Sequence, residues 1–318
     1  MESKFTRIVC AFLFCTFTFC YLFFYQAEVM QVTQHVASGG QTFYHPWVGA
    51  ILITLTLQVL QVGINSFLKL RKRGFALTYF PSILFLTVIS AVSPDIKDRL
   101  SIGAWVWIVP IMLIAYTAVI LYVKRYEPYE RELRTTGPFS QLVWINLGTL
   151  VLQFLFVGLL SNGNRAFHQR AKIEAAVYNR EYREALQLIR KMGETDSVTS
   201  MLTIYAVART GHLGDSLFHY PLVGGGKVLR PGIVHSMLQP DSVLINATKR
   251  SANYQLTGFL LNRDLHNFAR YLSEYYPVDS LRPRYYAEAN ALFAKINRGE
   301  KPQQPYEEGS YTKYYFER

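Results

Sequence analysis

The chain has 318 residues, half of them hydrophobic, and its 33 lysines and arginines against 22 aspartates and glutamates give a net charge of +11. Of these charged residues, 12 basic and 7 acidic ones precede residue 162, and 21 basic and 15 acidic ones follow it. Because the excess positive charge is spread over both parts and forms no single basic patch, the composition argues against a nucleic-acid-binding protein.

Five uncharged apolar runs, separated by short charged clusters, predict five transmembrane helices. A helix that spans a bilayer needs about 20 apolar residues, and after the last run the sequence is polar to its end. None of the runs contains Asp, Glu, Lys, Arg or His, which argues against an ion- or proton-coupled transporter. The predicted spans are residues 8–25, 47–67, 76–92, 102–123 and 141–161, and together they make a transmembrane domain over residues 1–161.

Cysteine and histidine positions argue against a metal site or a disulfide framework. Cys10, Cys15 and Cys20 all lie in the first apolar run, and steps of five residues turn a helix by about 140°, so the three share no face. His212 and His219 lack the tight paired spacing of zinc ligands. The sequence therefore predicts no metal and no cofactor.

Lysines and arginines beside the predicted spans indicate their orientation. The N-terminal segment carries two, the segments after spans two and four carry four each, and the loop after span one carries none. Positively charged segments stay in the cytoplasm and contact anionic membrane lipid. We therefore expect a cytoplasmic N-terminus in a bacterial inner membrane, and five spans then place residues 162–318 in the periplasm.

Three polar residues of the second span lie along one helix face. Gln58, Gln61 and Asn65 are spaced by three and four residues. We expect them to make interhelical hydrogen bonds, as amides in membrane helices do. A substrate path is the alternative interpretation.

From residue 164 onward the apolar residues recur at helical spacing, which predicts a soluble helical domain over residues 162–299. Further helices are predicted at residues 197–209, 215–220, 251–261, 265–275 and 283–297. The first stripe consists of Tyr178, Tyr182, Ala185, Leu186, Ile189 and Met192.

Three helix junctions of this domain resemble one another. Residues 179–186 align with residues 210–217 and with residues 262–269, and Tyr182 precedes Leu213 by 31 residues. This spacing is near the 34 of a tetratricopeptide repeat, and the region resembles that family. The spacing breaks over residues 221–240, and Ser216 and Phe268 replace the small alanine that the family pattern expects. We predict an all-α fold, with a five-span bundle followed by degenerate tetratricopeptide-like helical hairpins.

Several spans followed by such a domain, together with the stretch from Gly211 to Pro221, resemble a family of bacterial multi-pass membrane proteins that carries a domain of unknown function. That resemblance implies an envelope protein and brings no assigned activity. Residues 300–318, with Pro302, Pro305 and paired glutamates, predict a flexible tail.

A glycine run, Gly224-Gly225-Gly226-Lys227, suggests a phosphate-binding loop at first sight. A phosphate loop needs serine or threonine after the lysine and a strand before the glycines. Here Val228 follows and no strand is predicted. Turn chemistry alone explains the glycines, so we predict a loop between helices.

Acidic and histidine side chains in the predicted outer loops allow an enzymatic alternative. Glu28, His35 and His45 lie in the first outer loop, and Asp95 and Asp98 lie in the second. Glycosyl transferases that act on lipid-linked substrates place a carboxylate in an early outer loop, as a base or a metal ligand. The loops here lack a recognisable paired-carboxylate motif, so Glu28, His35 and Asp95 are catalytic candidates under this alternative only.

The preferred prediction is a non-enzymatic envelope scaffold, with no catalytic residue assigned. Stacked helix pairs bury one face and offer a concave surface on the other. We therefore expect the helical domain to bind another protein or a peptide segment outside the cytoplasm. A purely structural domain that packs on its own spans is the competing interpretation.

Overall fold

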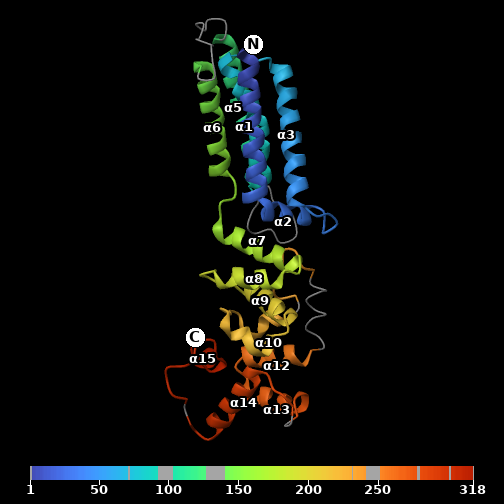
Figure 1. The fold of residues 1–318 in the computed structure, drawn as a ribbon, viewed down its shortest axis with the longest axis vertical. Helices are drawn as coiled ribbons and strands as arrows, with labels where there is room; N and C mark the ends of the chain where they lie inside the picture. The colour runs from blue at the N-terminus through green and yellow to red at the C-terminus, as the bar shows by residue number, and fades with distance from the viewer. Residues whose placement is uncertain are drawn as a thin grey trace. The chain divides into compact units, whose positions relative to one another are not determined.

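The computed structural model describes residues 2–70, 72–91, 103–126, 140–230, 232–240, 251–277, 280–300 and 302–317. All regular elements in these ranges are helices, as the all-α prediction requires. The chain forms two compact units, Met1–His168 and Gln169–Arg318. Figure 1 shows the helices of each unit in chain order.

Within the described residues of the first unit, five helices are long and apolar enough to cross a membrane. Each overlaps one of the five predicted runs. The spans consist of α1 (Glu2–Cys20) with the π-helical turn Tyr21–Tyr25, α3 (Pro46–Leu68), the 3-10 helix Lys72–Tyr79 with α4 (Phe80–Ser90), α5 (Trp105–Tyr126) and α6 (Gln141–Leu160).

These helices form one bundle (Figure 1), in which α1 packs against α3 and α6 while α4 packs against α3, α5 and α6. A short helix, α2 (Ala27–Ala37), follows the first span. Its apolar side buries Val29, Met30 and Val32. Most of the buried apolar side chains of the unit therefore come from α1 to α4 and α6, while α5 buries Ile120.

Buried amides satisfy the backbone where the third span departs from α-helical geometry. The 3-10 helix Lys72–Tyr79 precedes α4, and α6 supplies side chains to it. The Ala76 N–H donates to Asn146 Oδ1 at 2.8 Å, and Gln153 Nε2 donates to the Ala76 carbonyl at 3.1 Å. In an apolar bundle, backbone groups freed from a regular helix need such partners.

The polar face of the second span makes the interhelical bond that its sequence predicts. Gln61 Nε2 donates to Thr78 Oγ1 at 2.8 Å, and Gln58 Nε2 donates to Gln61 Oε1 at 3.1 Å. Ser82 Oγ also donates to the Leu57 carbonyl at 2.8 Å. The Gln61 and Ser82 bonds join α3 to the third span, whereas the Gln58 bond lies within α3. Asn65, the third predicted amide, has a buried Oδ1 atom without a hydrogen-bond partner among the described residues.

The second unit is built from short helices around one apolar core. Its elements are α7 (Arg165–Tyr178), which begins in the first unit, α8 (Tyr182–Arg190), α9 (Ser197–Arg209), α10 (Leu213–Ser216), α12 (Ala252–Leu261), α13 (Leu265–Tyr275), α14 (Arg284–Asn297) and α15 (Tyr311–Phe316), with 3-10 turns at Leu217–His219 and Gly225–Leu229.

The three aligned junctions adopt the same backbone turn. Their second residues, Arg180, Gly211 and Arg263, have φ values of 66°, 79° and 61°. In each junction the N–H of the next residue donates to the carbonyl five positions earlier, which is the helix-ending motif that requires a left-handed residue. A fourth copy ends α14, where Gly299 has φ 76° and the Glu300 N–H donates to the Lys295 carbonyl at 3.0 Å.

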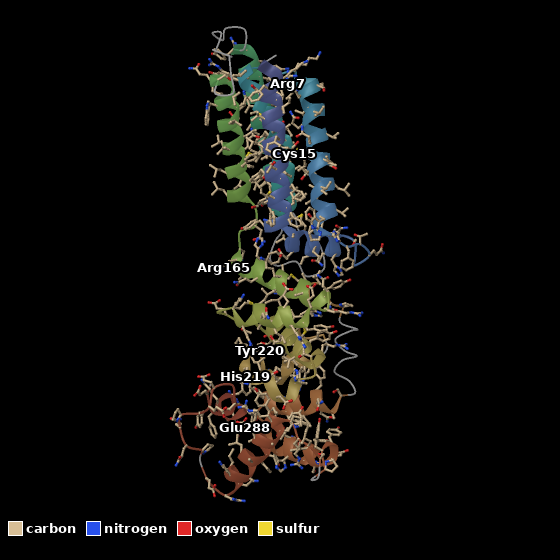
Figure 2. All side chains as sticks on the ribbon, in the orientation of Figure 1. Arg7, Cys15, Arg165, His219, Tyr220 and Glu288 are labelled. Carbon is tan, nitrogen blue, oxygen red and sulfur yellow. The ribbon has the colours of Figure 1, made fainter. Side chains whose placement is uncertain are left out.

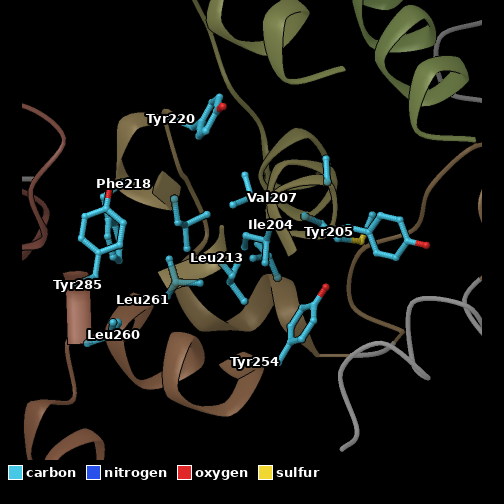
Figure 3. Close-up of a cluster of buried hydrophobic side chains, with 14 of the residues drawn as sticks. Ile204, Tyr205, Val207, Leu213, Phe218, Tyr220, Tyr254, Leu260, Leu261 and Tyr285 are labelled. Carbon is cyan, nitrogen blue, oxygen red and sulfur yellow. The ribbon is translucent and has the colours of Figure 1, made fainter. Parts of the chain in front are cut away.

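The core of the second unit lies where α9, α10 and α12 meet. Ile204, Leu213, Leu260 and Phe268 are each no more than 5 % exposed. Figure 3 shows the side chains of these helices converging, with Tyr285 at one side. Helix α10 is shorter than the predicted helix at residues 215–220, because it gives way to a 3-10 turn at Leu217.

The glycine run is required by close packing. Gly224 has φ 93°, and the Gly226 N–H donates to Asn262 Oδ1 at 2.9 Å. A Cβ atom on Gly226 would lie 2.6 Å from Asn262 Nδ2. The run therefore packs as a turn against the junction between α12 and α13.

The predicted flexible tail is a packed segment in the structure. Helix α15 places Tyr311 in the core, where it is fully buried. Glu288, labelled in Figure 2, accepts hydrogen bonds from the backbone N–H groups of Tyr311 at 3.1 Å and Thr312 at 2.8 Å. Arg263 also donates to the Tyr314 carbonyl at 2.8 Å. The aromatic side chains of this helix bury apolar area against the core. The polar residues that precede the helix led to the prediction of a flexible tail.

Candidate binding pocket

An open pocket of about 290 Å³ lies within the second unit, on the side of α8 that meets the second junction. One wall comes from α8 and the other from the turn into α10 and the residues after it. Tyr220, labelled in Figure 2 and Figure 3, is one of the lining residues. The lining residues are Arg183, Leu186, Arg190, Thr210, His212, Asp215, Ser216 and Tyr220.

Helix α8 orients the first wall. Its apolar stripe, which includes Ala185, Leu186 and Ile189, is buried and fixes the rotation of the helix on the core. Arg183 and Arg190 lie on either side of Leu186 at spacings of three and four residues, so all three share one face. Both arginines are exposed, whereas Leu186 is 8 % exposed and forms the floor of the pocket.

Arg190 is held in place by an aromatic ring. Its guanidinium carbon lies 5.0 Å from the centre of the Tyr220 ring, and Tyr220 itself is buried. A planar guanidinium over an aromatic face is stabilised electrostatically and loses less freedom when a ligand binds. The pocket therefore has one preorganised cationic group.

The second wall uses its polar groups mainly on the protein itself. Thr210 Oγ1 donates to the Val207 carbonyl at 2.9 Å, and Ser216 Oγ donates to the His212 carbonyl at 3.1 Å. These bonds hold the turn that shapes the wall. The hydroxyl protons are consequently directed to backbone carbonyls.

Asp215 has a structural role at the beginning of α14. Its Oδ1 atom accepts the backbone N–H of Arg284 at 2.8 Å, where the N-terminal end of a helix favours negative charge. The neighbouring Gly214 allows this approach, because a Cβ atom there would lie 2.4 Å from the Pro283 Cβ atom. The carboxylate therefore anchors α14 to α10.

The two arginines leave the pocket positively charged. Among the described residues, no carboxylate lies within ion-pair distance of the Arg183 or Arg190 guanidinium, and the ion pairs found there join other groups. Asp215 is the acidic residue of the lining. Guanidiniums with free N–H groups donate strong, charge-assisted hydrogen bonds to carboxylate and phosphate oxygens.

The catalytic candidates of the predicted outer loops that lie among the described residues occupy separate positions in the first unit. Glu28 and His35 lie on α2 seven residues apart, which corresponds to about 10.5 Å along an ideal helix. Burial lowers the pKa of His35. His45 is exposed and precedes α3. Asp95, like Asp98, lies outside the described residues, and within those residues no group of three His, Cys, Asp or Glu side chains is arranged to hold a metal ion.

A fully buried carboxylate in α7 anchors a loop of the second unit. The Glu174 carboxylate accepts hydrogen bonds from the Ser236 hydroxyl and from the Met237 N–H at 3.1 Å, and Arg170 Nε lies 3.9 Å away. Burial raises the pKa of Glu174, while these hydrogen bonds and the arginine oppose the rise. Glu174 therefore has a structural role, because it fixes the loop that contains Ser236 and Met237 to α7.

From the sequence, His212 is a candidate only for metal binding, and the two arginines of the pocket are not predicted. The available signal was the pair Arg183 and Arg190 around a core leucine on one helix face. Comparisons with protein-family models, with curated proteins and with solved structures each found no match to this chain. The residues of the pocket therefore carry the functional argument.

Proposed function

We propose that this chain is a membrane-anchored scaffold that binds another protein through the helical second unit and catalyses no reaction. The observation that carries the proposal is the open, positively charged pocket between α8 and the second junction. Five apolar helices in the first unit support a membrane anchor. The family resemblance and the tetratricopeptide-like character remain predictions.

The charged side chains of the pocket take no part in packing the core of the second unit. The buried apolar side chains of α8, α9, α12 and α13 pack on one another, while Arg183 and Arg190 stay exposed beside them. Short helix pairs that bury one face present the other to partners. A protein segment is therefore a fitting occupant of a pocket on this face.

The proposal includes a bacterial inner-membrane location, a cytoplasmic N-terminus and a periplasmic helical unit. Its support is the charge of the segments between spans, since positive segments stay in the cytoplasm. Fusions of a periplasm-dependent enzyme reporter after residue 40 and after residue 318 test it. We expect activity from both fusions, and a silent fusion after residue 318 would contradict the orientation.

Partner binding is tested by photo-crosslinking in living cells. A photoreactive residue is placed at His212, which lines the pocket, and in a control strain at Lys295, an exposed position on α14 outside the pocket. We expect one recurrent protein product from position 212 and none from position 295. Only self-crosslinks or lipid adducts at position 212 would overturn the scaffold proposal.

A further inference from the structure

The pocket has a chemical pattern that specifies its occupant. Arg183, Leu186 and Arg190 follow one another along α8 as one line of positive, apolar and positive side chains. An ideal helix places the Cα atoms of the two arginines about 10.5 Å apart along its axis. The line is therefore long enough for several residues of a ligand.

The positive charge of this line favours a ligand that brings negative charge. Asp215 is engaged with the Arg284 N–H, and neither arginine has a carboxylate partner among the residues that the structure describes. A basic ligand would place like charges against Arg183 and Arg190 and would be rejected. An acidic ligand forms charge-assisted hydrogen bonds with both.

We infer that the pocket binds an extended acidic segment of a protein partner, with an apolar residue between two acidic residues. In an extended chain the first, third and fifth side chains point to the same side and span about 13 Å at about 3.3 Å per residue. The flexible arginine stems cover the remaining difference in length. The inference rests on the proposed function, because it names the chemistry of the segment that the scaffold takes.

The geometry favours such a segment over a phosphate group. The arginines are separated along the helix, with the Leu186 side chain between them. The Thr210 and Ser216 hydroxyls donate to carbonyls of the chain, so they do not add donors around a single point. One phosphate group would leave the apolar surface of Leu186 between the arginines without a partner.

The two arginines differ in preorganisation, which predicts an order of effects. Arg190 is stacked on Tyr220, whereas Arg183 has no ring contact in the described part of the chain. A fixed guanidinium loses less conformational freedom on binding. Arg190→Gln is therefore expected to weaken binding more than Arg183→Gln, and Tyr220→Leu is expected to weaken it to an intermediate degree.

The first test is a selection of displayed random 12-residue peptides on the full chain in lipid nanodiscs. Wild-type chain is compared with the double variant Arg183→Gln, Arg190→Gln. We expect wild-type chain to enrich peptides with acidic residues four positions apart and an apolar residue midway, and the double variant to lose this enrichment. Peptides without acidic enrichment, or the same enrichment on the double variant, would overturn the inference.

The second test measures the affinity of the most enriched peptide by fluorescence anisotropy. Loss of one charged hydrogen-bonded pair is expected to weaken binding about tenfold for Arg190→Gln. Lys191→Gln is the matched control, because it removes one positive charge at the end of α8 outside the pocket lining. An equal loss in both variants would show binding to general positive charge and would contradict the inference.

Competitors separate the possible sources of negative charge. Inorganic phosphate, or vesicles containing an anionic phospholipid, is added at matched ionic strength to the bound peptide. We expect the peptide with glutamine in place of its acidic residues to compete at least tenfold more weakly than the parent, and phosphate and vesicles to be weak competitors. Displacement by phosphate or vesicles at the concentration of the parent peptide would overturn the assignment to an acidic segment.

Failure of this inference is distinguishable from failure of the proposed function. If the double variant retains the crosslinked partner at position 212, the scaffold stands and the acidic specificity is wrong. If position 212 captures no protein while the displayed acidic peptides bind in the pocket, the specificity stands and the scaffold function is wrong.

Discussion

In the first unit the buried amides Asn146 and Gln153 bind the backbone of Ala76, whereas in the second unit Arg183 and Arg190 face an open pocket without a carboxylate partner among the described residues. Polar groups inside an apolar bundle are costly unless they are satisfied, so the amides follow from folding alone. Exposed guanidiniums carry no such requirement. The Arg183 and Arg190 guanidiniums are exposed and keep their donors for a ligand, and this is why we place binding in the second unit.

The largest expected effect is a loss of stability that is confined to the second unit, because each unit has its own core. Phe268 is fully buried and its ring lies 5.7 Å from that of Tyr286. Phe268→Ala should lower the free energy of unfolding of the second unit by about 3–5 kcal/mol. Limited proteolysis of the full chain in nanodiscs should then cleave residues 169–318 and spare the described helices of residues 1–168. Equal loss of both units would show that they unfold together.

A smaller effect is expected from the amide that supports the 3-10 helix of the third span. Asn146→Leu leaves the Ala76 N–H without this acceptor, at a cost of about 1–3 kcal/mol. Thr149→Val is the matched control, since Thr149 is half-buried on the same helix and donates to the Ile145 carbonyl of its own helix. Unfolding in mixed micelles of increasing denaturing detergent measures both. A control as unstable as Asn146→Leu would contradict the structural role of the amide.

The buried carboxyl of Glu174 predicts how the stability of the second unit depends on pH. Its folded pKa is raised above the ordinary value of 4.5 by burial, so the folded state keeps a proton that the unfolded state releases. Between these two pKa values the folded state binds more protons, and stability falls as pH rises. Glu174→Gln should remove this slope, as measured by denaturation of the full chain at several pH values. An unchanged slope would assign the pH dependence to other groups.

The smallest effect is expected at the two catalytic candidates on α2. Glu28→Gln and His35→Gln should leave both abundance and partner capture unchanged, because the scaffold needs no base or metal ligand there. Crosslinking yield at position 212 measures the result. Loss of cellular function at unchanged abundance in Glu28→Gln would favour the enzymatic alternative.

The fold could be predicted where one physical rule acts locally. Apolar length alone locates all five candidate spans, and 3.6-residue periodicity locates α13 at the predicted residues 265–275. The junction alignment also corresponds to a shared backbone turn, because that turn depends on a few consecutive residues. Helix α15 was not predictable in this way, since Tyr311 gains its stability from burial against distant residues such as Phe218.

The pocket could not be derived from sequence because its parts meet only in the tertiary structure. Arg190 and Tyr220 are in contact although α9 separates them in sequence. Asp215 accepts a hydrogen bond from the N–H of Arg284, which lies far along the chain. From the sequence alone, without the hydrogen bond from the Arg284 N–H, Asp215 would be expected to form an ion pair with one of the arginines. The sequence contains the line Arg183, Leu186 and Arg190. Only the tertiary structure shows that no described carboxylate forms an ion pair with these arginines.

The most direct test places one photoreactive residue at either of two exposed histidines, His212 in the pocket or His45, which precedes α3 in the first unit. Products from living cells are then identified by mass. The account predicts a recurrent protein product from position 212 that disappears in the Arg183→Gln, Arg190→Gln double variant, and no such product from position 45. A partner captured at position 45 and absent from position 212 would contradict the assignment of binding to the second unit.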